Sequence, residues 1–260
     1  VQLSINKPHT HYLCGDTTEC TCPEGQKETA PVTFKLWTDA LAEAQNGARA
    51  TAANSLPSQA GSYYLATNVK LSETWTPANG TVLDLCGKTI EATGDFAAIN
   101  VDKGSFTLVD CKSDNYGTIT HTDGKTGSGV YVDDTGTFTM YGGTITGNTV
   151  KDGDGDGGGV YVADGFDTTA GSFTMYGGTI SGNKAVSSSN DANGNGGGVF
   201  VAYRYYSNAK VPGSFTMYGG TIENNEASYA GGGVYAGDTF TMNNGTIKNN
   251  KAYNGGGVYL

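Results

Sequence analysis

Hydrophobic and polar residues alternate with a period of two in short runs along most of the chain. In the run Ser-Phe-Thr-Met-Tyr at 172–176, Phe and Met alternate with Ser, Thr and Tyr, and in Gly-Val-Tyr-Val at 159–162 two valines flank a tyrosine. This alternation, rich in β-branched and aromatic residues, predicts short strands that bury one face. Gly-Gly and Gly-Asn pairs follow the runs and predict tight corners, because glycine and asparagine tolerate positive φ.

The runs belong to two motifs that alternate along the chain. The first, close to S/T-F-T-M-Y-G-G-T-I-x-x-N, holds all four methionines of the chain and spans 137–148, 172–183, 214–225 and 239–250. The second, close to G-G-G-V followed by an aromatic residue, spans 128–132, 157–162, 196–201, 231–236 and 255–260. Repetition at this scale indicates a solenoid, in which each unit covers only its neighbours.

Each repeat contains three predicted strands, V-x-V, F-x-M and T-I, and three corners. The shortest unit, from Phe215 to Phe240, is long enough for one turn of a three-sided parallel coil. The predicted fold class is therefore all-β: a right-handed parallel β-helix of about six three-strand rungs, with an N-terminal cap that contains a short helix.

Like residues are expected to stack from rung to rung in this fold. The expected columns are an F-type column (Leu83, Phe106, Phe138, Phe173, Phe215, Phe240), a V-type column (Val69, Ile99, Val130, Val160, Val199, Val234, Val258), an outward aromatic column (Tyr131, Tyr161, Phe200, Tyr235, Tyr259) and an amide ladder (Asn148, Asn183, Asn225, Asn250). Met fills the gaps of such a core because it is flexible.

Two regions follow from the pattern: a Cys/His-containing cap segment at 1–62 and the β-helix at 63–260. The Ala-rich stretch 36–55 predicts the short helix of the cap, with Thr38 as N-cap and Leu41, Ala44 and Ala48 on one face. A loose linker is the alternative for this segment. The chain begins at Val1 without a methionine and stops in mid-repeat, so we expect a removed leader or upstream segment and a continuation beyond residue 260.

Composition and net charge limit the classes of partner that the chain is expected to bind. The chain has 41 glycines, which suits a corner-rich coil, and a net charge of −10, which argues against nucleic acid and anionic membranes as partners. No apolar run approaches the ~18 residues needed to span a bilayer.

The cysteines and histidines allow either disulfides or a metal site. Cys86 and Cys111 are expected to lie on adjacent rungs and to form a disulfide. The N-terminal set could bind zinc through its soft ligands, or form a Cys14–Cys20 or Cys14–Cys22 disulfide instead, and an inert tail is the third alternative. That set comprises His9, His11, Cys14, Cys20 and Cys22.

The repeats resemble those of known surface proteins. G-G-G-V followed by a strand, alternating with I-x-x-N, resembles the GGA[ILV] and F-x-x-N repeats of the chlamydial polymorphic outer-membrane adhesins, with Ile in place of Phe. A closer resemblance is to the repeat-rich β-helix surface proteins of Gram-positive gut bacteria, carried by His9–Gly15, Leu56–Leu65 and Thr137–Asn148. It implies an exported, pectate-lyase-like β-helix at the cell surface.

Enzymes of the pectate-lyase-like fold use an Arg or Lys base near acidic calcium ligands, or clustered carboxylates. This chain has two arginines, Arg49 and Arg204, and His121 is expected to be a lone surface residue. Of the six outward positions expected on the F-strands, only Asp84 carries a carboxylate. The other five are threonines: Thr107, Thr139, Thr174, Thr216 and Thr241. We therefore expect a protein that is not an enzyme, with a polysaccharide lyase or glycosidase as the alternative.

Two long corners are the expected binding site. The corners at 163–172 and 202–214 are expected to bulge from the same side of the coil, and the exposed side chains there suit a glycan or a surface protein. The ligand-binding residues expected are Phe166, Tyr203, Arg204, Tyr205 and Tyr206. Loops that fold these aromatics onto the coil are the alternative.

Two further hypotheses are calcium binding and ice binding. Asp152, Asp154 and Asp156 resemble the start of an EF-hand loop, so they are candidate calcium ligands, although the closing Glu is missing and a solvated acidic turn is the alternative. The Thr ladders resemble those of ice-binding β-helices. The function expected is thus an extracellular, non-catalytic adhesin or binding scaffold that requires no cofactor, with a structural stalk or ice-binding surface as minor alternatives.

Overall fold

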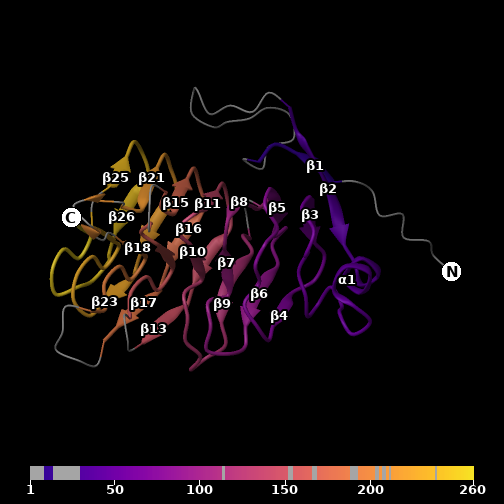
Figure 1. Cartoon of the computed structure of the whole chain (residues 1–260), viewed down its shortest axis with the longest axis horizontal. Helices are drawn as coiled ribbons and strands as arrows, with labels where there is room; N and C mark the ends of the chain where they lie inside the picture. The colour runs from indigo at the N-terminus through magenta and orange to yellow at the C-terminus, as the bar shows by residue number, and fades with distance from the viewer. Residues whose placement is uncertain are drawn as a thin grey trace.

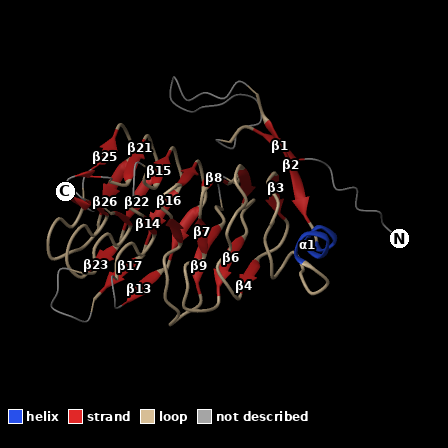
Figure 2. Ribbon diagram, viewed as in Figure 1, coloured by secondary structure: helices blue, strands red, loops and turns tan. Residues whose placement is uncertain are grey.

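The computed structural model describes residues 9–13, 30–112, 115–151, 155–165, 169–187, 193–202, 205–206, 209–210, 212–237 and 239–260. At positions 9, 205, 206, 209 and 210 the description covers the backbone alone. The described chain is mostly strand, with the one helix α1 (Asp39–Asn46) at one end of the molecule (Figure 2). The prediction of an all-β protein is confirmed at this level.

Most strands belong to three sheets, which we name after the residue that each repeats. The Phe sheet contains β1 (His9–His11), β2 (Val32–Trp37), β3 (Ser62–Leu65), β5 (Thr81–Asp84), β8 (Gly104–Val109), β11 (Gly136–Met140), β15 (Ser172–Met175), β21 (Ser214–Met217) and β25 (Thr239–Met242). The Val sheet contains β7 (Ile99–Val101), β10 (Val130–Val132), β14 (Val160–Val162), β18 (Val199–Val201), β24 (Val234–Ala236) and β27 (Val258–Tyr259).

The Ile sheet contains β4 (Val69–Leu71), β6 (Thr89–Ala92), β9 (Thr118–His121), β12 (Thr144–Thr146), β16 (Thr179–Ser181), β22 (Thr221–Glu223) and β26 (Thr246–Lys248). A short sheet joins β13 (Thr149–Lys151), β17 (Lys184–Val186) and β23 (Glu226–Ala227), and a hairpin joins β19 (Tyr205–Tyr206) to β20 (Ala209–Lys210). Among the described strands, only β1–β2 and β19–β20 pair antiparallel.

The chain visits the three large sheets in turn. From β7 onward it passes from the Val sheet to the Phe sheet and then to the Ile sheet before returning, as in β10, β11, β12 and β14. We call one such set of three successive strands a rung. The colour in Figure 1 therefore changes steadily from α1 to the C-terminus, because rungs that are neighbours in sequence are neighbours in space.

Like residues face each other from rung to rung in the repeat region, 128–250. Phe138 pairs with Phe173, and Phe173 with Phe215, and their rings stack with centroids 4.9 and 4.7 Å apart. Met140 pairs with Met175 in the same way, and both are buried. The four copied segments thus supply equivalent positions of one continuous core.

Glycine is required where the chain turns out of the Phe sheet. Gly178 has φ 85°, and a Cβ there would lie 2.6 Å from Cε of Met140 and 2.7 Å from the carbonyl oxygen of Gly143. Gly143 and Gly220, at the same place on the adjacent rungs, have φ 84° and 86°. A side chain at this corner would therefore clash with the rung below as well as strain the backbone.

Two assignments to the expected columns are wrong. Leu83 pairs with Leu108, not with Phe106, whose partner is Thr81; Asp84 accordingly pairs with Val109 rather than Thr107. Val69 pairs with Ile90 in the Ile sheet, while the Val-sheet neighbour of Ile99 on that side is Trp75, through an isolated bridge. The first rungs lack the repeated motif, so a two-residue shift keeps the same face inward and cannot be detected from the period alone.

The predicted amide ladder is present. Nδ2 of Asn148 donates to Oδ1 of Asn183 (2.9 Å), and Nδ2 of Asn183 donates to Oδ1 of Asn225 (3.0 Å). Each of these Nδ2 groups also reaches the carbonyl of an isoleucine on the rung before, Ile119 and Ile145 respectively. The ladder satisfies buried backbone and side-chain groups together, which is what a buried polar column requires.

His121 is not the surface residue that we expected. It is buried at the head of the amide ladder, where its Nδ1 lies 2.7 Å from Oδ1 of Asn148. Its Nε2 lies 2.7 Å from the carbonyl oxygen of Phe96. The His121 ring therefore meets Oδ1 of Asn148 as the asparagine of the preceding rung does in the later repeats, although His121 stands one residue earlier in the strand register.

Residues 30–62, which include α1, lie at the end of the sheets opposite the C-terminus (Figure 1). Thr38 is the N-cap of α1, as predicted, and its hydroxyl accepts from the backbone N–H of Leu41 at 3.3 Å. The buried face differs from the predicted one, because Ala42 packs into the core while Ala44 and Ala48 are exposed. The helix of the described chain is too short to cross a membrane.

Candidate functional site

Two neighbouring rungs carry long insertions at one corner between the Val sheet and the Phe sheet. The first insertion leaves at Ala163 and returns at Gly171, whose N–H donates to the carbonyl of Ala163 at 3.0 Å. The second leaves at Ala202 and returns at Gly213, whose N–H donates to the carbonyl of Ala202 at 2.9 Å. Both insertions thus leave from and return to equivalent points on adjacent rungs.

The rung before them shows the same corner in its short form. There the N–H of Gly136 donates to the carbonyl of Asp133 at 2.9 Å, which closes a tight turn. Gly136, Gly171 and Gly213 all precede the outward Ser or Thr of a Phe-sheet strand. Residues 164–170 and 203–212 are therefore additions to a turn that the fold can make without them.

The longer insertion contains the hairpin of β19 and β20. Tyr205 pairs with Lys210, and Tyr206 with Ala209, in antiparallel register. Phe166, Tyr203 and Arg204 lie outside the described residues, as do the side chains of Tyr205 and Tyr206.

The predicted outward aromatic column is present on the Val sheet. Its rings follow one another with centroid distances of 4.8 Å for Tyr131–Tyr161, 5.0 Å for Tyr161–Phe200, 5.0 Å for Phe200–Tyr235 and 5.4 Å for Tyr235–Tyr259. The faces of stacked rings contact one another, so mainly the ring edges remain accessible to a ligand. The column therefore suits a structural role better than face-to-face stacking on a sugar.

The acidic turn is described only in part. Asp152 and Asp154, two of the three candidate calcium ligands, lie outside the described residues. Oδ1 of Asp156 accepts from the backbone N–H groups of Gly194 (3.0 Å) and Asn195 (2.7 Å), and from Nδ2 of Asn195 at 3.1 Å. Asp156 thus organises the turn of the next rung.

The N-terminal Cys/His set is divided between described and undescribed residues. Cys14, Cys20 and Cys22 lie outside the described residues, and His9 is described only as part of β1. His11 is fully buried, and its ring stacks on Phe34 of β2 with centroids 4.5 Å apart. Its Nε2 lies 3.0 Å from Oδ2 of Asp84, on β5 of the Phe sheet.

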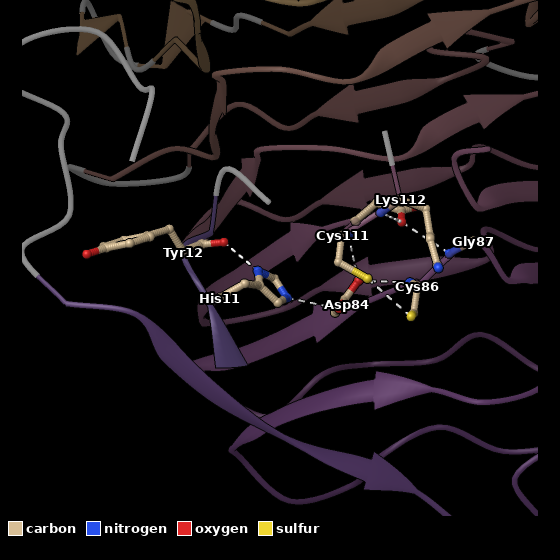
Figure 3. Close-up of polar contacts among 8 residues, drawn as sticks. His11, Tyr12, Asp84, Cys86, Gly87, Cys111 and Lys112 are labelled. Atoms are coloured by element: carbon tan, nitrogen blue, oxygen red, sulfur yellow. Dashed lines mark hydrogen bonds and ion pairs between the residues drawn. The ribbon is translucent and has the colours of Figure 1, made fainter. Parts of the chain in front are cut away.

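The expected disulfide partners belong to the same cluster. Sγ of Cys86 and Sγ of Cys111 are 3.1 Å apart as two thiols, with Cys111 donating to Cys86. Oδ1 of Asp84 accepts from the backbone N–H groups of Cys86 (2.8 Å) and Cys111 (3.1 Å). Figure 3 shows the Asp84 carboxylate between the His11 ring on one side and the two sulfur atoms on the other.

The geometry of the His11–Asp84 pair accounts for its ionisation. Burial alone would lower the pKa of His11, but its contacts with Asp84 and with the carbonyl of Tyr12 leave that pKa raised. Burial alone would raise the pKa of Asp84, but the hydrogen bonds from His11, Cys111 and Cys86 leave it lowered. Both ring nitrogens of His11 face acceptor oxygens, which favours the protonated ring, and the protonated ring would form a buried ion pair with the Asp84 carboxylate.

The two thiols differ in acidity for the same geometric reason. The hydrogen bond from Cys111 lowers the pKa of Cys86, whereas donating that bond, burial and the charge of Asp84 raise the pKa of Cys111. Asp110, next to Cys111, is buried and has its pKa raised to about 6 by burial, in spite of backbone hydrogen bonds from Lys112, Gly117 and Gly87.

Sequence reasoning missed how His11, Asp84 and Cys111 combine. Asp84 was assigned to an outward place of its strand, and its neighbour Leu83 does face the core. Asp84 is nevertheless fully buried, because His11 covers it from outside. The available signal was a carboxylate beside each cysteine, in Asp84-Leu85-Cys86 and Asp110-Cys111.

No protein-family model matches the sequence, and no curated protein and no solved structure matches it either.

Proposed function

We propose that the chain is a right-handed parallel β-helix that acts as an exported, non-catalytic binding module at a bacterial cell surface. Its partner is a glycan or a surface protein. Recognition takes place at the paired corner insertions, residues 164–170 and 203–212. The resemblance of the repeats to β-helix surface proteins suggests the class, and the insertions suggest where the module binds.

One observation carries the proposal: two adjacent rungs lengthen the same corner, although the fold closes that corner tightly at Asp133–Gly136. Loops that depart from minimal geometry on a rigid scaffold are common places for recognition. Each insertion is closed at its base by one backbone hydrogen bond, and the two bases are joined by hydrogen bonds from the N–H groups of Ala202 and Ser214 to the carbonyls of Val162 and Gly171. A partner that spans both would contact a composite surface that neither insertion offers alone.

The rest of the rung supports a scaffold role. On both sides of the insertions the Val and Phe strands keep strict register, Val162 with Val201 and Phe173 with Phe215. A stack that is satisfied by its own neighbours holds the insertions in place without depending on their sequence. The sequence of the insertions is therefore free to encode a partner.

The test shortens the insertions to the tight turn of the preceding rung. The replacement is the dipeptide Asp-Thr, which stands at the same place in the short corner as Asp134-Thr135. One variant carries it in place of residues 203–212, a second in place of residues 164–170, and a third carries both replacements. Each variant and the unchanged chain are screened on an array of host and bacterial glycans and against bacterial surface proteins. Tyr131→Ser is the control, because it removes an outward aromatic residue from the Val-sheet column instead.

We expect the double variant to lose binding and the Tyr131→Ser variant to retain it. Melting temperatures should change little on shortening, since loop-closure entropy varies slowly with loop length. Binding that survives both replacements would refute the role of the insertions. Turnover of pectin or another polysaccharide by the unchanged chain would refute the non-catalytic assignment.

A further inference from the structure

Three different donor atoms converge at the N-terminal side of the Phe sheet, away from the corner insertions. Nε2 of His11, a carboxylate oxygen of Asp84 and Sγ of Cys111 all lie within 4.8 Å of one another. Sγ of Cys86 adds a fourth donor, 3.1 Å from that of Cys111. In a tetrahedral zinc site the ligand atoms lie about 3.3–3.8 Å apart, so displacements of about 1 Å would place the donors of His11, Asp84 and Cys111 around one ion. Sγ of Cys86 lies outside that group of three and would join it by rotation of its side chain.

The donors are already oriented by the contacts that support metal ligands in other proteins. Nδ1 of His11 donates to the carbonyl of Tyr12, which leaves Nε2 directed at the cluster. Oδ1 of Asp84 is held by the N–H groups of Cys86 and Cys111, which leaves Oδ2 facing His11. In metal sites, a ligating histidine usually donates its second ring N–H to a carbonyl or carboxylate, and a ligating carboxylate is usually held by hydrogen bonds of its own.

The local charge and backbone also suit a cation. The carboxylates of Asp84 and Asp110 lie against the two segments that carry the thiols: Oδ1 of Asp84 accepts from the N–H groups of Cys86 and Cys111, and Oδ1 of Asp110 accepts from those of Gly87 and Lys112. Cys86 has φ 48°, a left-handed conformation that a non-glycine residue rarely adopts. Sγ of Cys86 lies 3.1 Å from Sγ of Cys111, and residues held in such sparsely populated conformations concentrate at functional sites.

We propose that His11, Asp84, Cys86 and Cys111 bind one zinc ion, which fastens strand β1 to β5 and to the residues that follow β5 and β8. Imidazole and thiolate ligands favour zinc over calcium or magnesium, which prefer oxygen. On binding, Zn²⁺ replaces the proton on Nε2 of His11 and the thiol protons of Cys86 and Cys111, and these protons pass to the solvent. The four ligands close a tetrahedral site of the structural kind.

The site differs from the zinc set that the sequence predicts and is independent of the proposed function. Of the five N-terminal residues in that set, it uses His11 alone, and it takes its other ligands from β5 and from the residues that follow β5 and β8. Its role is to join segments that are distant in the chain, since residues 11, 84–86 and 111 meet at one ion. The binding module at residues 163–213 needs no metal for its contacts.

The test measures zinc in the full chain purified from zinc-supplemented medium without chelator. Elemental analysis should give one zinc per chain, and cobalt substitution should give the thiolate-to-cobalt charge-transfer band with the d–d bands of a tetrahedral site. Asp84→Asn and Cys111→Ser should each weaken zinc binding at least about 100-fold, measured by competition with a chromogenic chelator. His9→Ala is the matched control in the same strand and should leave zinc binding unchanged.

Asp84→Asn keeps the shape of the side chain, so it separates metal loss from misfolding, and circular dichroism should match that of the unchanged chain. Zinc that persists in both Asp84→Asn and Cys111→Ser would overturn the proposal, and its loss in Cys20→Ser or Cys22→Ser would instead assign the metal to the N-terminal set. A mapped Cys86–Cys111 disulfide in the chain purified without reductant would also overturn it, because disulfide sulfurs are not thiolate ligands.

Discussion

The repeat region and the N-terminal cluster are built in opposite ways. In the repeat region, 128–250, the Phe, Met and Ile side chains of the core meet copies of themselves one rung away, as Phe138 meets Phe173. In the cluster, His11, Asp84 and Cys111 meet once, from three distant parts of the chain. The first arrangement spreads stability over many equivalent contacts, whereas the second concentrates it in a few that have no substitute.

The largest effect is expected from breaking the ring column of the Phe sheet. Phe173→Ala removes a buried ring that stacks on Phe138 and Phe215, and we expect it to reduce the free energy of unfolding by about 3–5 kcal/mol. Phe240→Ala is the matched control, because Phe240 is only partly buried and stacks on Phe215 at 5.1 Å. Denaturant titration of the 260-residue chain should therefore give a clearly smaller loss for Phe240→Ala.

A smaller effect is expected from interrupting the amide ladder. Asn183→Ala removes the Nδ2 donor to the carbonyl of Ile145 and the Oδ1 acceptor of the backbone N–H of Asn148, and we expect a total cost of about 1–3 kcal/mol. Asn244→Ala, at an exposed corner, should cost much less. Equal midpoints of urea unfolding for the two variants would show that the ladder contributes nothing to stability.

The smallest effect is expected at the surface of the short sheet formed by β13, β17 and β23. Hydrogen bonds from Lys251 and Lys184 lower the pKa of Glu226, so its contribution to stability is present at neutral pH and is lost as the pH falls through that lowered pKa. The groups are exposed, so Glu226→Gln should cost less than about 1 kcal/mol at pH 7. The difference between the thermal melts of the two chains should shrink on acidification; a difference that grows would have the wrong sign.

The sequence predicted the regular features of the repeat region because they recur. The outward aromatic column and the amide ladder each appear several times at fixed spacing, so their register could be found without coordinates. The first rungs were harder: Leu83 and Val69 fit more than one column, since apolar residues alternate there without a marker such as Phe or Met. A period indicates which face a residue takes and leaves open which neighbour it meets.

The candidate sites were less predictable, for a different reason. His11 and Asp84 are separated by most of the N-terminal segment, and nothing local shows that one covers the other. His121 illustrates the same limit, because its place at the head of the ladder depends on Asn148 of the following rung. The corner insertions were visible as interruptions of the repeat, and the equivalence of their end points followed only from the hydrogen bonds at Ala163 and Ala202.

Hydrogen exchange in the chain and in its Asp84→Asn variant tests the contrast most directly, with a chelator present so that no metal contributes. The substitution removes the charge that pairs with His11, worth about 1.5–3 kcal/mol for a charged hydrogen bond. Exchange should accelerate about 10- to 100-fold in residues 9–13 and in β2, with rates across residues 172–225 unchanged. We expect the N-terminal cluster to stabilise only its own surroundings and the repeat region to be stable without it. Exchange that accelerates equally in both regions, or in neither, would contradict that expectation.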